Sequence, residues 1–187
     1  GYSYEDQKDT TNNGIARIAS YVNKVRSENE NVLLVDNGDT IQGTILTDDL
    51  YNKKHIDELH PVMEVMNKMG YASMALGNHE FNFGLDLVAK LENDAEFPLL
   101  SANSTYKADG IQFVEPYTIV EVAGLKVGII GVTTPNVPRW DGENVDALQF
   151  GHMGETVAKY VEEINDQVDL IVVTAHAGMN AEYDEEG

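Results

Sequence analysis

The sequence predicts an α/β fold. Short aliphatic runs, such as Val32-Leu33-Leu34-Val35 and Leu170-Ile171-Val172-Val173-Thr174, have the length and composition of strands buried on both faces. Segments with apolar residues at helical spacing separate these runs, and that alternation is typical of a parallel sheet with helices on its faces. The 187 residues, 42% of them apolar, are enough to bury one sizeable core.

Helices and strands alternate through the first half of the chain. A helix is predicted after Asn12 and Asn13, which are good caps, and it ends in the polar run 27–30. A second helix begins at Pro61 and stops at Gly70, and a third follows Gly84. Strands are predicted at 32–35, 72–76 and 97–101. The apolar residues expected to face the core are Ile15, Ile18, Ala19, Val22 and Val25, then Val62, Met63, Val65, Met66 and Met69, then Leu85, Leu87, Val88 and Leu91.

The pattern changes in the second half of the chain. Residues 117–122 alternate, Ala123-Gly124 forms a turn, and 126–132 is apolar again, which predicts a β-hairpin. Polar loops are predicted from the end of the third strand to Gly110 and from Thr133 to Phe150. A last helix and the strand 170–174 follow, and the helix carries Val157, Tyr160, Val161 and Ile164 on its apolar face.

The composition excludes several classes of partner and site. A formal charge of −20 argues against nucleic acid polymers and anionic membrane surfaces, which both require a basic patch. The sequence has no cysteine, so disulfides and thiolate metal sites are excluded. No apolar stretch approaches the roughly 20 residues of a membrane span, and the first residues do not have the pattern of a signal peptide.

Polar residues whose side chains can bind a metal ion follow several of the predicted strands. Asp39 lies in the turn after the first strand, Asn78 and His79 follow the second, and His176 follows the last. Open α/β sheets bind ligands at the carboxyl ends of their strands. Carboxylate, amide oxygen and imidazole are ligands of divalent ions such as manganese, zinc, iron or cobalt. We therefore expect a metal site at this edge of the sheet.

Each of these residues also has an ordinary structural interpretation when it is taken alone. Asp39 and Asn78 are common turn residues, and either histidine could be a structural side chain. Glu80 is expected to support the site rather than to bind metal. Asn103, after the third strand, either supports the site or stabilises its own loop. The metal interpretation rests on the whole set and on its order along the chain.

These turns carry a resemblance to a known family. The segments Asn37-Gly38-Asp39 to Gly43, Gly77-Asn78-His79-Glu80, and His176-Ala177-Gly178, each after a strand, resemble the calcineurin-like metallophosphoesterases. The likeness extends to His60-Pro61-Val62, Thr134-Pro135 and Trp140-Asp141. It is strongest to the bacterial 2',3'-cyclic-nucleotide 2'-phosphodiesterase/3'-nucleotidase branch of the 5'-nucleotidase group. The family fold is a sandwich of two mixed β-sheets flanked by helices.

The resemblance implies a role for each site residue. Asp39 bridges two divalent ions, and Asn78 and His176 bind the second of them. His79 lies near the scissile phosphate and donates a proton or a hydrogen bond without binding metal. The 5'-nucleotidases have aspartate where this chain has Asn82, whereas the cyclic phosphodiesterase branch has asparagine. An amide at this position orients His79 but cannot keep its imidazole charged as a carboxylate does.

The resemblance also implies that the metal centre is partial in residues 1–187. The family's first metal site begins with Asp-x-His on the opening strand and ends with Gly-His-x-His, and neither motif occurs in this sequence. The family's C-terminal domain, which stacks the nucleobase, is not matched either. We therefore expect one incomplete catalytic domain over residues 1–187, with little or no activity when it is isolated.

The implied activity is metal-dependent hydrolysis of nucleoside 2',3'-cyclic phosphates and then of the 3'-phosphate. A 5'-nucleotidase or UDP-sugar hydrolase is the alternative enzyme, and a non-catalytic binding domain of the same fold is the alternative from another class. A nucleotide is the expected partner. Family membership implies a location outside the cell, in the cell wall or in the periplasm.

Overall fold

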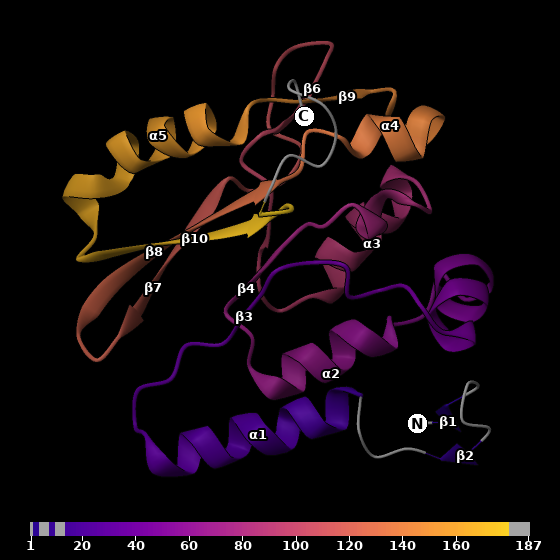
Figure 1. Ribbon diagram of the computed structural model, residues 1–187, viewed down its shortest axis with the longest axis horizontal. Coiled ribbons are helices and arrows are strands. Elements are labelled where there is room, and N and C mark those ends of the chain that lie inside the picture. Colours follow the sequence, from indigo (N-terminus) through magenta and orange to yellow (C-terminus); the bar gives the residue numbers. More distant parts are fainter. Residues whose placement is uncertain (1, 4–7, 10–13, 180–187) are drawn as a thin grey trace. The chain divides into compact units, whose positions relative to one another are not determined.

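The computed structural model describes residues 2–3, 8–9 and 14–179 of the chain (Figure 1). The chain is divided into two compact units, Gly1–Leu33 and Leu34–Gly187. The first unit contains the antiparallel pair β1 (Tyr2–Ser3) and β2 (Lys8–Asp9) and the helix α1 (Ile15–Glu28). The predicted caps Asn12 and Asn13 lie outside the described residues. Ile18 was predicted to face the core but is 49% exposed, because the less exposed side of α1 runs through Ile15, Ala19, Val22 and Arg26 and Ile18 lies at its edge.

The second unit contains two three-stranded sheets. One has the order β10-β8-β7 and is mixed, since β8 pairs in parallel with β10 and antiparallel with β7. The other has the order β3-β4-β5 and is parallel throughout. Their strands are β3 (Val35–Asp36), β4 (Ser73–Ala75), β5 (Leu99–Leu100), β7 (Tyr117–Val122), β8 (Leu125–Thr133) and β10 (Leu170–His176).

Successive residues of β8 point to opposite faces of its sheet, and their contacts show how the two sheets pack. A Cβ built on Gly131 would lie 2.4 Å from the Cβ of Leu100, so β8 and β5 approach closely on that face. Ile130 and Val132 point to the opposite face and pack with Tyr160 and Ile164 of α5 (Met153–Ile164). Figure 1 shows α5 along that outer face, with α2 (Pro61–Met69) and α3 (Leu85–Asp94) beyond β3 and β4. The predicted α/β fold of sheets flanked by helices is therefore confirmed, although among the described strands only the β10-β8-β7 sheet is mixed.

The loops contain more regular structure than the sequence predicted. A π-helix (η1, Leu46–Lys54) lies between β3 and α2. The predicted loop 133–150 is wrong in part, because it contains the helix α4 (Val137–Asp141), the 3-10 turn η3 (Gly142–Val145) and β9 (Leu148–Phe150). β9 pairs antiparallel with β6 (Ser104–Tyr106), in the other predicted loop. Short 3-10 turns lie at His79–Phe81 (η2) and Asn165–Gln167 (η4).

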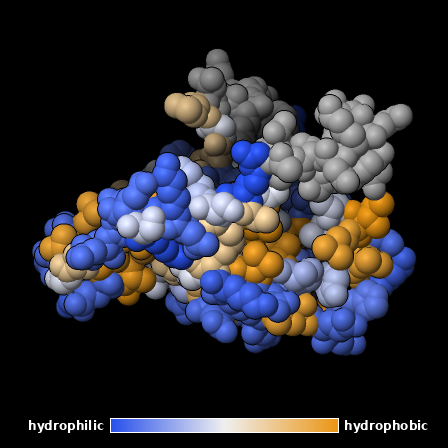
Figure 2. Space-filling view, turned by 90° about the horizontal axis from the view of Figure 1, so that it is seen from below, coloured by the Kyte–Doolittle hydropathy of each residue, from blue (hydrophilic) through white to orange (hydrophobic). Residues whose placement is uncertain are grey.

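The edge strands differ from the prediction in their burial. Among the described strands β10 has only β8 beside it, and its Leu170 and Val173 are exposed. Hydrophilic residues make up much of the face seen in Figure 2, in keeping with the strongly acidic composition. Within the described residues, no helix has the length and apolar character required to cross a bilayer.

His60 forms a buried cap at the start of α2. Its Nδ1 accepts a hydrogen bond from the Val62 N–H at 3.3 Å, so its Nε2 carries the proton and donates to Asn52 Oδ1 at 2.9 Å. The ring is fully buried. Burial lowers the pKa of His60 from 6.5 to about 4, and the positive charge of Lys90 acts in the same direction. His60 is therefore neutral in the folded protein, where it begins the helix.

This cap predicts a loss of stability in mild acid. Protonation of His60 favours the unfolded chain, so its stabilising contribution is complete above pH 6.5 and is lost as the pH falls toward 4. Between pH 7 and pH 5 this amounts to about 2 kcal/mol. Asparagine can cap a helix without titrating, so urea unfolding of the wild type should lose about 2 kcal/mol more than that of His60→Asn. The exposed His55 provides the control, His55→Asn. Equal losses in the wild type and in His60→Asn would contradict the prediction.

Candidate metal centre

The turn after β3 gives Asp39 its orientation. Asp36 closes the turn, since its Oδ1 accepts hydrogen bonds from the Gly38 N–H at 2.9 Å and the Thr40 hydroxyl at 2.7 Å. Gly38 has a φ of 87° and Asp39 a φ of 60°, both in the left-handed region. Aspartate tolerates this conformation better than most residues because its short polar side chain forms local hydrogen bonds.

Glu80 joins the two turns on which the site depends. Its carboxylate accepts the backbone N–H groups of Asp39 at 2.8 Å, Thr40 at 2.8 Å and Gly77 at 2.7 Å. The side chain is completely buried, and burial raises its pKa, although the three N–H donors act in the opposite direction. Both oxygens are occupied by backbone groups, so Glu80 holds the two turns together and its carboxylate does not face the ligand atoms.

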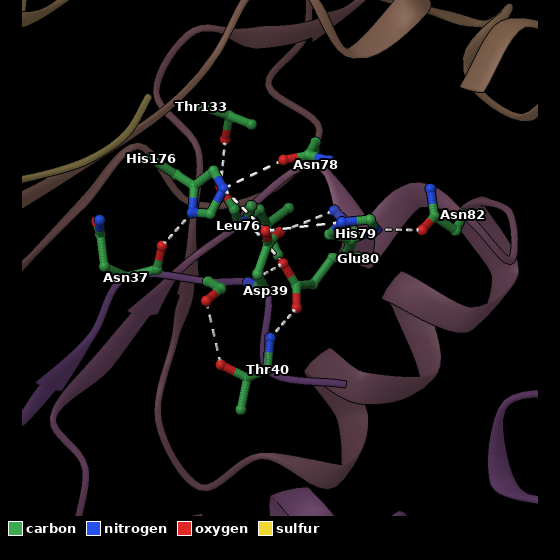
Figure 3. Close-up of polar contacts among 12 residues, drawn as sticks. Asn37, Asp39, Thr40, Leu76, Asn78, His79, Glu80, Asn82, Thr133 and His176 are labelled. Atoms are coloured by element: carbon green, nitrogen blue, oxygen red, sulfur yellow. Dashed lines mark hydrogen bonds and ion pairs between the residues drawn. The ribbon is translucent and has the colours of Figure 1, made fainter. Parts of the chain in front are cut away.

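Asp39, Asn78 and His176 converge from three strand ends, as Figure 3 shows. His176 Nε2 lies 3.3 Å from Asp39 Oδ2 and 3.2 Å from Asn78 Oδ1. The opposite ring nitrogen, Nδ1, donates to the Asn37 carbonyl oxygen at 2.6 Å. This bond orients the ring and leaves Nε2 directed at the other two donors, the usual arrangement of a metal-binding histidine.

The end of β8 fixes the strand that carries His176. Thr133 pairs in register with His176, and the Thr134 N–H donates to the His176 carbonyl at 2.9 Å. Asn103 is buried and bonds both the N–H and the carbonyl of Thr133, at 2.9 and 2.7 Å. Thus Asn103, for which the sequence left two roles open, supports the strand next to the site.

Asp39 and His176 form an ion pair. Burial raises the pKa of Asp39, but the hydrogen bonds from His176 and from the His79 N–H, together with the charges of both histidines, lower it further, so the net shift is downward. The hydrogen bond to Asp39 raises the pKa of His176 to about 9 against the opposing effect of burial. In neutral solution the carboxylate is therefore ionised, and a proton lies where a cation would bind.

The donor set fits a divalent ion. Ligands about 2.0–2.2 Å from one ion lie about 3.0–3.5 Å apart in octahedral or tetrahedral geometry. The separations of 3.2 and 3.3 Å fall within that range. The types of donor, one carboxylate, one amide oxygen and one imidazole, suit a borderline metal. The described residues include no group of three or more His, Cys, Asp or Glu placed to hold a metal ion, so the amide of Asn78 is essential to this set.

Gly77 is required by the close approach of the turns. A Cβ at this position would lie 2.3 Å from Asp39 Oδ1, 2.6 Å from the Asp39 nitrogen and 2.8 Å from His176 Cε1. We therefore expect Gly77→Ala to displace both side chains and to lower Mn²⁺ affinity at least about tenfold, measured by calorimetric titration. Gly151→Ala is the control, because its Cβ would meet nothing closer than 3.6 Å. Equal affinity of the two variants would contradict this packing argument.

His79 stands beside the three donors. Its Nε2 lies 4.0 Å from Asp39 Oδ2, and its backbone N–H donates to Asp39 Oδ1 at 2.9 Å. Its Nδ1 lies 2.6 Å from Asn82 Oδ1, the contact that the family resemblance implied between these residues. Asn82 Nδ2 donates in turn to Asp141 Oδ1 at 2.6 Å. Sequence reasoning did not assign a role to Asp141, whose position was visible only as part of the Trp140-Asp141 likeness.

Comparison with known proteins places the chain in a family. The calcineurin-like phosphoesterase family matches residues 9–187. The 2',3'-cyclic-nucleotide 2'-phosphodiesterase/3'-nucleotidase of Salmonella typhimurium is 36% identical over 97% of this chain, which spans 30% of that protein. A snake venom 5'-nucleotidase of Naja atra is 36% identical over 88% of this chain, which spans 31% of it. The solved structure of the calcineurin-like phosphoesterase YfkN from Bacillus subtilis has a TM-score of 0.88 at 33% identity, covering 96% of this chain and 58% of that one. The chain therefore belongs to the calcineurin-like phosphoesterase family, as its turn motifs predicted.

Proposed function

We propose that this chain carries part of the catalytic centre of a metal-dependent phosphoric ester hydrolase. The observation that carries the proposal is the convergence of Asp39 Oδ2, Asn78 Oδ1 and His176 Nε2 beside the imidazole of His79. A carboxylate, an amide oxygen and an imidazole suit a divalent ion. The imidazole of His79 lies beside these three groups without being one of them, which suits a role in proton transfer.

In this proposal each residue has a separate task. Asp39, Asn78 and His176 would hold a divalent ion, and Asp39 would also serve a second ion in the complete enzyme. A pair of divalent ions would supply Lewis acidity, neutralise phosphoryl charge and activate the attacking water. Asn37 keeps His176 Nε2 directed at the ion through its bond to Nδ1. His79 Nε2 delivers a proton to the leaving oxygen as the phosphorus–oxygen bond breaks.

The proposed substrates are nucleoside 2',3'-cyclic phosphates, followed by 3'-nucleotides. Two observations support this choice: asparagine at position 82, and the name of the Salmonella typhimurium relative. The 5'-nucleotidase alternative is supported by the Naja atra relative, which has a similar identity over a shorter part of the chain. We also propose that the protein acts outside the cytoplasm, a view supported by the venom origin of that relative.

The substrate assignment can be tested with two nucleotides. Mn²⁺-dependent release of phosphate or nucleoside is measured with 2',3'-cyclic AMP and with 5'-AMP, on residues 1–187 and on the complete protein. We expect the complete protein to prefer the cyclic substrate and to lose activity in EDTA. Preference for 5'-AMP would support the nucleotidase alternative, and inactivity of the complete protein on both would favour a binding domain of the same fold.

A further inference from the structure

Asp141 is a buried carboxylate with an incomplete set of partners. It closes α4 and is only 8% exposed. Its Oδ1 accepts the Asn82 side-chain N–H, whereas Oδ2 has no hydrogen-bond partner among the described residues. Buried carboxylates are costly unless they are paired, so this arrangement calls for a reason beyond packing.

The contact with Asn82 determines which way the amide of that residue faces. Asp141 Oδ1 accepts the hydrogen bond in this contact, so Asn82 directs its NH₂ group to Asp141 and its Oδ1 to His79. The amide oxygen can also only accept, so His79 Nδ1 must carry a hydrogen. A second bond, from Asn144 Nδ2 to the Asn82 carbonyl at 3.0 Å, holds the backbone of Asn82 in place.

We propose that Asp141 is a positioning residue that acts through Asn82 to hold His79 in the Nδ1–H tautomer. The consequence is that Nδ1 keeps its hydrogen, and Nε2, which lies 4.0 Å from Asp39 Oδ2, is the ring nitrogen left to contact a bound phosphate ester. After His79 gives the Nε2 proton to a leaving oxygen, the ring that remains is the neutral Nδ1–H form that Asn82 stabilises. This kinetic consequence rests on the proposed function, whereas the tautomer itself does not.

The tautomer can be measured without any substrate. In chain labelled with ¹⁵N-histidine, long-range ¹H–¹⁵N spectra at pH 9, where an ordinary imidazole is neutral, distinguish protonated from unprotonated ring nitrogens. The wild type should show His79 with Nδ1 protonated and Nε2 bare. Asp141→Asn allows the Asn82 amide to turn over, and it should shift His79 to a mixture of tautomers. Asp146→Asn, an exposed change in the same segment, should match the wild type. Unchanged His79 signals in Asp141→Asn would overturn the proposal.

A reversed pair gives an independent test. Asn82→Asp alone places two carboxylates in contact, whereas Asn82→Asp combined with Asp141→Asn restores a donor facing an acceptor and keeps an acceptor against His79 Nδ1. Turnover of the complete enzyme should fall roughly tenfold to a hundredfold in each single variant and recover in the double variant, with little change in KM. A double variant that folds but is no better than the singles would overturn the proposal, even if Asp141→Asn alone does not fold. The wild type and all variants could prove inactive on nucleotides while the His79 signals change as expected. That outcome would reject the proposed function and leave the positioning role of Asp141 intact.

Discussion

Asp39→Asn is expected to abolish metal-dependent phosphoesterase activity, lowering turnover about 1000-fold or more in the complete protein. Metal ions contribute several kcal/mol to the transition state of such reactions, and about 4 kcal/mol corresponds to this factor. Asparagine removes the negative charge that faces His176 Nε2 at 3.3 Å, and it can turn its NH₂ group toward the ligand position. Metal affinity and turnover should therefore fall together.

The same substitution should leave the fold intact. Asp39 has a φ of 60°, and asparagine is among the residues that tolerate this conformation best. Its amide oxygen can still accept the His79 N–H that Asp39 Oδ1 accepts at 2.9 Å. The exposed Asp57→Asn serves as a control for an equal change in net charge. A variant with normal melting behaviour and normal Mn²⁺-dependent turnover would show that Asp39 does not hold the metal.

His79→Ala is expected to separate metal binding from catalysis. The ring is not part of the cluster formed by Asp39, Asn78 and His176, and its Nδ1 is bonded to Asn82. Mn²⁺ affinity should stay within about twofold of the wild type, whereas turnover should fall about 10²- to 10⁴-fold, the usual contribution of a general acid. Calorimetric titration and steady-state rates on the same preparation measure both quantities.

His176→Ala is the matched comparison for His79→Ala. It removes an imidazole of the same size, but one whose Nε2 faces two other donors. This variant should lose Mn²⁺ affinity first and turnover as a result. If His79→Ala instead lost the metal while His176→Ala retained it, the roles of the two histidines would have to be exchanged.

Elements with complete local signals were predicted well from the sequence. Helix α2 begins with Pro61 behind the His60 cap and stops at Gly70, whose φ of 67° glycine adopts without a steric cost. The β7–β8 hairpin was visible from the alternation before Ala123-Gly124 and the apolar run after it. Elements that depend on distant pairing were missed. Strand β9 exists because it meets β6, more than 40 residues earlier in the chain, and three residues are too few to give a period of their own.

In the candidate site too, the residues with a local signal were predicted from the sequence and the contacts between distant residues were missed. Asp39, Asn78, His79 and His176 could be selected because each follows an apolar run, and strand ends gather at one edge of a sheet. The contacts that hold them were less accessible. Glu80 reaches backbone groups 41 residues away, and Asp141 lies 59 residues from its partner Asn82. Neither contact leaves a periodic pattern in the sequence, so only the folded arrangement reveals them.

The most direct test of the metal centre is an anomalous difference map from crystals of the chain soaked in MnCl₂. We expect a peak about 2.0–2.4 Å from Asp39 Oδ2, Asn78 Oδ1 and His176 Nε2, with His79 outside the coordination sphere. Manganese bound elsewhere, with no peak in contact with Asp39, would contradict it.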